Sequence, residues 1–190
     1  MLGLWQTKLT HCTDEALMQK IVKGNIRAFE VLYDRYSALI YRFCYRMLGQ
    51  NAPLSEDFTQ DIFLKIIEKP EFFDPTRSFK SWIYWLATNK CKNAYRDKKD
   101  VQNIDNYLFE HHENIEFIID NQAFETHLMT AIDKLDMSVK QCFVLRYLED
   151  LSIKEIALIV GIPEGTVKSR LHHTAKKLAG ELAWCRDILE

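Results

Sequence analysis

Apolar residues in the first half of the chain recur every three or four positions, which is the period of an amphipathic α-helix. One such stripe runs from position 29 to position 47, and Gly49 is suited to ending its helix. A second stripe has an apolar residue at every fourth position from 58 to 66. The stripes consist of Phe29, Leu32, Tyr33, Tyr36, Ile40, Phe43 and Met47, followed by Phe58, Ile62 and Ile66. The pattern predicts two consecutive helices, the first of about 20 residues.

Residues that commonly begin or end helices mark the limits of the next elements. Ser55, after Pro53, is expected to cap the second helix, and Pro70 is expected to end it. Ser78 is expected to cap a third helix. The buried side of that helix would consist of Phe79, Trp82, Ile83 and Leu86.

The later turns of the third helix are polar and basic. Four residues spaced by three or four share one face there, namely Asn89, Lys92, Asn93 and Arg96, with Lys90, Lys98 and Lys99 around them. Cations suit phosphates, amides suit base edges, and rings such as those of Tyr84, Trp85 and Tyr95 suit base stacking. The pattern therefore indicates a single-stranded nucleic-acid surface. The alternative is a solvated basic helix end, with the tryptophans in the core.

The last third of the chain has the spacing of a helix-turn-helix. Ser138 and Ser152 are expected to cap successive helices, and Ala157, Gly161 and Val167 follow Ile153 by four, eight and fourteen residues. Pro163 suits the first turn of the second helix of the motif. The outward positions of that helix are Thr166, Lys168, Ser169, Arg170, His173 and Lys177. They are expected to enter a major groove or to contact phosphates, and the alternative is a helical hairpin with a solvated basic face.

Composition favours an all-α fold and suggests how the helices are grouped. Only 6 Gly and 4 Pro occur in 190 residues, which is too few for a turn-dense β-sandwich. The net charge is −2, but residues 101–130 contain six Asp or Glu and no Lys or Arg. We therefore expect two small helical domains, at 14–100 and 124–190, joined by an acidic linker at 101–123 and preceded by an extension at 1–13.

Neither a metal site nor a membrane segment is predicted. The five cysteines form no C-x-x-C pair, and their odd number does not suit a secreted disulfide framework, which indicates a reducing, cytoplasmic location. No apolar run approaches the roughly 18 residues of a membrane span. The adjacent His11 and Cys12, and the pair His111 and His112, lack partners at ligand spacing, so no metal or other cofactor is expected.

Four sequence blocks resemble a known family. "GNIRAFEVLYDRYSALIYRFCYRMLGQ", "SEDFTQDIFLKIIEKP" and "FKSWIYWLATNKCKNAYRDKKD" are similar to region two of extracytoplasmic-function sigma factors, group IV of the sigma-70 family. "AIDKLDMSVKQCFVLRYLEDLSIKEIALIVGIPEGTVKSRLHH" is similar to their region four. The resemblance covers about positions 14–182 in the family's order. It implies a non-catalytic factor that binds core RNA polymerase and promoter DNA, and an anti-sigma factor, often membrane-anchored, as its regulator.

The resemblance also implies roles for particular residues. The second helix matches the contact with the clamp helices of the large polymerase subunit, through Asp57, Gln60, Asp61, Phe63 and Lys65. The loop 72–78 and the third helix match the part that opens and reads the minus-ten element, through Phe79, Asn89, Lys92, Asn93 and Arg96. The helix 163–178 matches the reader of the minus-thirty-five element, although the family commonly has Arg at the positions of His173 and Ala175. The acidic linker matches a segment directed toward the polymerase exit channel.

Two other classes of protein compete with this interpretation. In a stand-alone transcriptional regulator, residues 131–190 would bind operator DNA without polymerase at a two-fold site, and residues 14–100 would sense a ligand or dimerise. In an enzyme, Asp57, Asp61 and Glu68 could act as helical carboxylate ligands. However, no E-x-x-H pair, nucleophile motif or glycine-rich phosphate loop accompanies these carboxylates.

Overall fold

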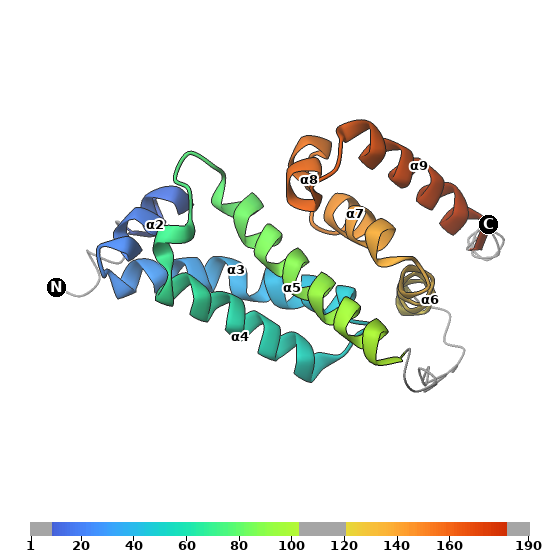
Figure 1. Cartoon of the computed structure of the whole chain (residues 1–190), viewed down its shortest axis with the longest axis horizontal. Helices are drawn as coiled ribbons and strands as arrows, with labels where there is room; N and C mark the ends of the chain where they lie inside the picture. The colour runs from blue at the N-terminus through green and yellow to red at the C-terminus, as the bar shows by residue number, and fades with distance from the viewer. Residues whose placement is uncertain (1–8, 103–120, 182–190) are drawn as a thin grey trace. The chain divides into compact units, whose positions relative to one another are not determined.

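The computed structural model describes residues 9–102 and 121–181, and all regular secondary structure in these two stretches is helical (Figure 1). The elements are α2 (Asp14–Val22), α3 (Ile26–Met47), α4 (Ala52–Glu68), the 3₁₀ helix η1 (Pro70–Phe72), α5 (Phe79–Gln102), α6 (Asn121–Asp133), α7 (Met137–Tyr147), α8 (Ile153–Val160) and α9 (Glu164–Glu181). The predicted all-α class is confirmed. The chain divides into two compact units, one centred on α2–α4 and the first part of α5, the other on α6–α9.

Helices extend into both ends of the range 101–123, which the sequence predicted as an acidic linker. Helix α5 continues to Gln102 and α6 begins at Asn121, so both ends of the range 101–123 are helical. The acidic residues from Asp105 to Asp120, the pair His111 and His112, and Cys185 lie outside the described residues.

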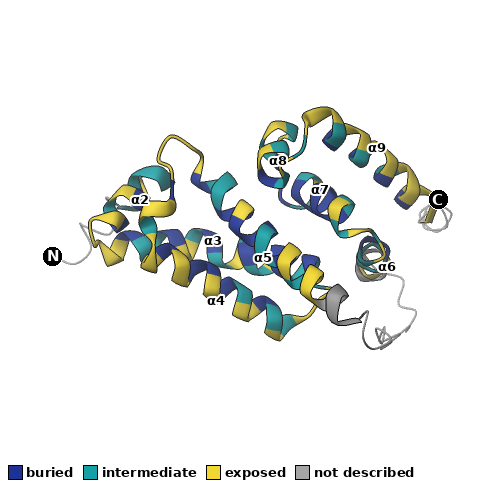
Figure 2. Cartoon of the chain, in the orientation of Figure 1, coloured by how far each residue is buried: buried dark blue, intermediate teal, exposed yellow. Residues whose placement is uncertain are grey.

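In the first unit, α3 packs against both α2 and α4. Residues of the apolar stripes predicted from the sequence lie in its core, where Leu32, Ile40 and Phe43 of α3 are fully buried together with Ile66 of α4 and Ile83 of α5. Figure 2 shows buried and exposed residues alternating along these helices. Burial of side chains of this size contributes about 1.5–3 kcal/mol each. The period of the apolar residues was therefore a correct guide to most of the buried positions, although Tyr33 of the predicted stripe is 42% exposed.

The turn between α3 and α4 is compact and differs in one detail from the prediction. Gly49 and Gln50 both have left-handed backbone conformations, with φ of 64° and 62°. Asn51 then caps α4, because its side chain accepts a hydrogen bond from the backbone N–H of Leu54 at 3.0 Å. The predicted cap Ser55 is wrong: Ser55 is buried one turn inside α4, and its hydroxyl donates to the carbonyl of Asn51 at 2.6 Å.

Helix α2, which the apolar stripes did not predict, is attached to α3 by an acidic residue of its first turn. Its N-cap is Thr13, which accepts the N–H of Ala16 at 3.3 Å. The carboxylate of Asp14 accepts hydrogen bonds from Arg35 and from the hydroxyl of Tyr36, both on α3. The first turn of α2 is therefore fixed to the middle of the unit.

The hydroxyl of Tyr36 makes stability depend on pH in the alkaline range. Burial, followed by the hydrogen bond to Asp14 and the negative charge of Asp14, raises the pKa of Tyr36 above its ordinary value. An unfolded tyrosine ionises near pH 10, so the stabilising contribution is complete below about pH 10 and is lost as the pH rises toward the higher native pKa. We expect urea titrations between about pH 9 and pH 11 to show a steeper loss of unfolding free energy for the native chain than for Tyr36→Phe. The exposed-tyrosine variant Tyr33→Phe should behave like the native chain, and an equal slope for Tyr36→Phe would contradict this account.

The second unit contains the predicted helix-turn-helix. Ser152 and Glu155 form a capping box at the start of α8, with the Glu155 N–H donating to the Ser152 hydroxyl at 3.3 Å and the Ser152 N–H donating to the Glu155 carboxylate at 2.9 Å. Gly161 has a left-handed backbone conformation, with φ of 74°. Val167 and Ile156 are fully buried, as the packing of the two helices of the motif requires.

Two other helix starts in this unit differ slightly from the prediction. Helix α7 begins at Met137, and its N-cap Asp136 makes no side-chain capping bond, so Ser138 lies inside the first turn and is not the cap. Helix α9 begins at Glu164, and the backbone N–H of Thr166 donates to the carbonyl of Pro163 at 2.9 Å. Pro163 therefore stands immediately before the helix.

Among residues 9–102 and 121–181, no helix combines the length and the apolar character that crossing a bilayer requires.

Candidate functional site

Helix α4 exposes most of the residues that the sequence assigned to partner binding. Asp57, Gln60, Asp61 and Lys65 are exposed. The prediction for Phe63 is wrong, because this side chain is only 2% exposed. The ring of Phe63 packs edge-on against those of Tyr33 and Phe29, with centroid distances of 4.8 Å and 6.1 Å. Phe63 therefore holds α4 against α3 and is not available to a partner.

Two apolar residues that the sequence interpretation missed lie beside Gln60. Leu64 is 51% exposed and Ile67 is 42% exposed. They follow Gln60 by four and seven residues, so the three side chains share one face of α4, and Asp57 precedes them on the same side. We call the face formed by Asp57, Gln60, Leu64 and Ile67 the α4 surface. The available signal was the five apolar residues within positions 62–67, interrupted only by Lys65, which are too many to be buried on one side of a helix.

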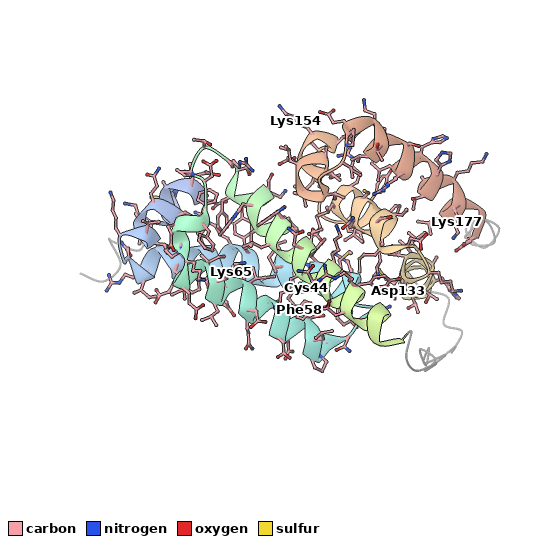
Figure 3. The ribbon with its side chains drawn as sticks, in the orientation of Figure 1. Cys44, Phe58, Lys65, Asp133, Lys154 and Lys177 are labelled. Atoms are coloured by element: carbon pink, nitrogen blue, oxygen red, sulfur yellow. The ribbon has the colours of Figure 1, made fainter. Side chains whose placement is uncertain are left out.

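Asp61 already has a partner on α5. Its carboxylate lies 2.6 Å from the ammonium of Lys90, which also stands over the ring of Phe58 at 4.6 Å. Phe58 is labelled in Figure 3. The pair is partly exposed and contributes little to stability. A cation from another molecule could therefore bind Asp61 only by displacing or sharing Lys90.

The polar face predicted on α5 is present, but two of the proposed aromatic residues are not on it. Lys92, Asn93 and Arg96 are exposed and Asn89 is half-buried. Their exposed aromatic neighbours are Trp85, which precedes Asn89 by one turn, and Tyr95, with 43% and 47% exposure.

The two buried aromatic residues are Phe79 and Tyr84. Phe79 is fully buried, so its predicted contact with the minus-ten element is wrong. Tyr84 is 1% exposed and packs edge-on against Phe43, with the ring centroids 5.4 Å apart. Both rings belong to the core of the first unit and cannot stack on bases.

The loop 73–78, which leads into α5, is ordered by its own hydrogen bonds. The Asp74 carboxylate accepts bonds from the hydroxyl and the backbone N–H of Thr76, at 2.7 Å and 3.0 Å. These bonds, with a smaller effect of the Arg77 charge, lower the pKa of Asp74. At the start of the loop, Phe73 is buried against Trp82, with a ring distance of 5.2 Å. The loop therefore has a defined conformation.

Helix α9 presents a polar face opposite its packed side. Lys168, Ser169, His173 and Lys177 are exposed and Thr166 is half-buried, whereas the buried positions are Val167, Leu171, Thr174 and Leu178. His172 and Lys176 are also exposed on α9 and were not predicted. Arg170 differs from the prediction, because its guanidinium donates to the carbonyl of Ser138 at 2.9 Å and thereby connects α9 to α7.

The thiols and carboxylates of the described residues do not suggest metal chemistry. No group of three or more His, Cys, Asp or Glu within residues 9–102 and 121–181 is arranged to hold a metal ion. Cys44, Cys91 and Cys142 are buried and not disulfide-bonded. Burial raises the pKa of Cys142, although the neighbouring Arg170 acts in the opposite direction. These cysteines are therefore core residues.

A helical unit with a partly apolar helix surface and an amide-rich basic face, followed by a helix-turn-helix unit, defines a two-domain DNA-binding factor of transcription. Sequence profiles agree: Sigma-70 region 2 matches residues 32–101 and Sigma-70 region 4 matches residues 127–178. The chain belongs to the extracytoplasmic-function (ECF) family of RNA polymerase sigma factors. It is an alternative sigma factor, and members of this family are initiation factors that are not enzymes.

Relatives support this assignment over nearly the whole chain. The ECF sigma factor SigW of Bacillus subtilis is 31% identical over 183 residues, which cover 90% of this chain and 96% of SigW. The sigma-E factor of Escherichia coli K12 is 27% identical, covering 84% of this chain and 88% of the relative.

Solved structures show the same fold. CnrH, in complex with the cytosolic domain of CnrY, aligns with a TM-score of 0.70 and 24% identity, covering 90% of this chain and 97% of CnrH. RpoE of Bartonella quintana, in complex with the anti-sigma factor NepR, aligns with a TM-score of 0.68 and 19% identity, covering 82% and 96%.

Proposed function

We propose that this sigma factor binds the clamp helices of the large subunit of core RNA polymerase through the α4 surface. The observation that carries the proposal is the exposure of Leu64 and Ile67 beside Gln60. Two adjacent apolar side chains flanked by polar residues are typical of a protein interface. Asp61 and Lys65, at the edge of the same helix, would add charged contacts.

In the same proposal, the first unit opens the minus-ten element and the second anchors the minus-thirty-five element. The loop 73–78 would hold a flipped base, whose unstacking costs a few kcal/mol, while Asn89, Lys92, Asn93 and Arg96 would contact the opened strand. The exposed residues of α9 would enter the upstream major groove. Because the net charge of the whole chain is −2, the free chain is not expected to bind DNA tightly, and attachment of both units to polymerase would supply the affinity by effective concentration.

The test is gel filtration of the full chain with bacterial core RNA polymerase, comparing the native chain with the double variant Gln60→Ala/Asp61→Ala. We expect the native chain to co-elute with polymerase and the variant to elute separately. The variant Glu30→Ala, which removes an exposed charge from α3, serves as the control and should co-elute. If the native chain fails to co-elute but binds duplex DNA alone, the protein acts as a stand-alone regulator.

Substitution of one lysine on α9 tests the upstream contact. Lys168→Ala is expected to weaken promoter binding by the holoenzyme and to lower the slope of log K against log salt by about one. Lys134→Ala removes another exposed lysine, from outside α9, and should leave the slope unchanged. Filter-binding titrations at several salt concentrations measure the affinity and the slope for each variant. Equal slopes for the native chain and Lys168→Ala would contradict the proposed contact of α9 with upstream DNA.

We also propose that an anti-sigma factor, anchored in the membrane, controls this protein in the cytoplasm by covering the α4 surface. Support comes from the exposed apolar residues of that surface, which a second protein could bury as polymerase would. The inhibitor and polymerase would then compete. A complex with an anti-sigma factor that still binds core polymerase would contradict this arrangement.

A further inference from the structure

The first turn of α2 reaches a part of the molecule that is remote in sequence. The Glu15 carboxylate accepts a hydrogen bond from the backbone N–H of Phe79 at 2.9 Å, across 64 positions of the chain. Leu17 and Met18 of the same helix are fully buried, and Asp14 is bonded to Arg35 on α3. Glu15 is therefore presented from a fixed element.

The N–H that Glu15 accepts belongs to the first residue of α5. The first N–H groups of a helix have no partner within the helix, and a negative charge nearby is favourable there. The local cap is weak, since the Ser78 hydroxyl lies 3.4 Å from the N–H of Ser81. Glu15 thus supplies, from another helix, a shorter hydrogen bond at the junction of the loop 73–78 with α5.

The other end of this loop is also fixed. Phe73 is buried, and its ring lies 5.8 Å from that of Phe79 and 5.2 Å from that of Trp82. Residues 74–78 therefore span two anchored points, and the bonds of Asp74 to Thr76 shape the span between them. A loop that discriminates among bases must hold its contacting groups within a fraction of an ångström, which requires such supports.

We propose that Glu15 is a positioning residue for base reading by the loop 73–78, acting through the Phe79 N–H and not through DNA. The inference rests on the proposed function of that loop. Glu15 lies before the segment 32–101 that matches Sigma-70 region 2. Its proposed role therefore rests on the hydrogen bond to Phe79 and not on the similarity to that family.

The test measures base discrimination by the holoenzyme formed from the full chain and core polymerase. A promoter for the native holoenzyme is first selected from a randomised DNA pool. The probes are four fluorescent single strands that carry its minus-ten element. They differ only at the base for which the native holoenzyme shows the largest preference. We expect the ratio of Kd values between the worst and best bases to be at least about fivefold for the native chain. It should fall below about twofold for Glu15→Ala and stay close to the native value for Glu15→Gln, which keeps an acceptor oxygen. Partial unfolding of a variant does not alter this ratio, because the inactive fraction changes all four apparent Kd values by the same factor.

Glu30→Ala, which removes an exposed acidic side chain from α3, is the matched control and should keep the native ratio. Core affinity, measured by fluorescence anisotropy of labelled sigma, should change less than about twofold for all three variants, since the α4 surface is untouched. An unchanged ratio for Glu15→Ala, or an equal loss for Glu30→Ala, would overturn the proposal. A native holoenzyme without any base preference would instead overturn the proposed function of the loop.

Discussion

A chain carrying Leu64→Asp and Ile67→Asp is expected to lose stable association with core RNA polymerase. The two side chains are about half exposed on α4, so their replacement should change the free energy of unfolding little. In the proposed complex they would be buried, and a carboxylate buried without a partner is strongly unfavourable. A penalty of about 2 kcal/mol for each corresponds to roughly 1,000-fold weaker binding.

Val22→Asp and Ile26→Asp together form a matched control for this experiment. Val22 and Ile26 are 54% and 58% exposed, and the double substitution adds the same charge to exposed positions of α2 and α3, outside the four residues of the α4 surface. Anisotropy titration of labelled sigma with core polymerase should give native affinity for the control, and circular dichroism should show that both variants are folded. Native affinity of the Leu64/Ile67 variant, or an equal loss in the control, would remove the α4 surface from the proposal.

Phe79→Ala is expected to lower the free energy of unfolding by about 3–5 kcal/mol, because a fully buried aromatic ring would be replaced by a cavity. The ring of Phe79 lies 5.1 Å from that of Tyr36 and 5.8 Å from those of Phe73 and Trp82. It therefore joins α3, the loop 73–78 and α5. Any loss of promoter binding should follow the unfolded fraction as urea or temperature is varied.

Phe72→Ala is the control for this prediction. Phe72 is 58% exposed, and its removal should change the free energy of unfolding by less than about 1 kcal/mol. Urea denaturation of both variants gives the comparison. If Phe79→Ala were as stable as the native chain but failed to bind promoter DNA, Phe79 would be a DNA contact, as the sequence alone had suggested.

The helices were predictable where one local signal decides the structure. The Ser152 cap of α8 and the left-handed Gly161 depend on residues close in sequence, and the Ser152 cap was predicted. The start of α4 was less certain, because Asn51 and Ser55 are both good caps four residues apart. Pro53 is compatible with the earlier start, since proline is favoured in the first turn of a helix.

The binding surfaces were harder to predict because exposure depends on tertiary partners. Phe63 and Phe79 have motif positions that suggest contacts, yet each is buried by rings from distant segments, including Tyr33 and Tyr36. Leu64 was missed for the converse reason: in an apolar run, periodicity alone does not show which side of the helix packs. The hydrogen bond from Phe79 to Glu15 had no sequence signal at all.

The turn that joins α3 to α4 has a thermodynamic consequence for complex formation. Four residues, 48–51, connect α3 and α4, and the left-handed Gly49 and Gln50 reverse the chain without a flexible segment. Ordering a backbone residue costs about 1–2 kcal/mol, and here that ordering is completed during folding. A partner that docks on α4 would therefore restrict side-chain rotamers alone, which leaves more of the contact energy as affinity. The preorganisation of the surface is in this way a property of residues that need never touch the partner.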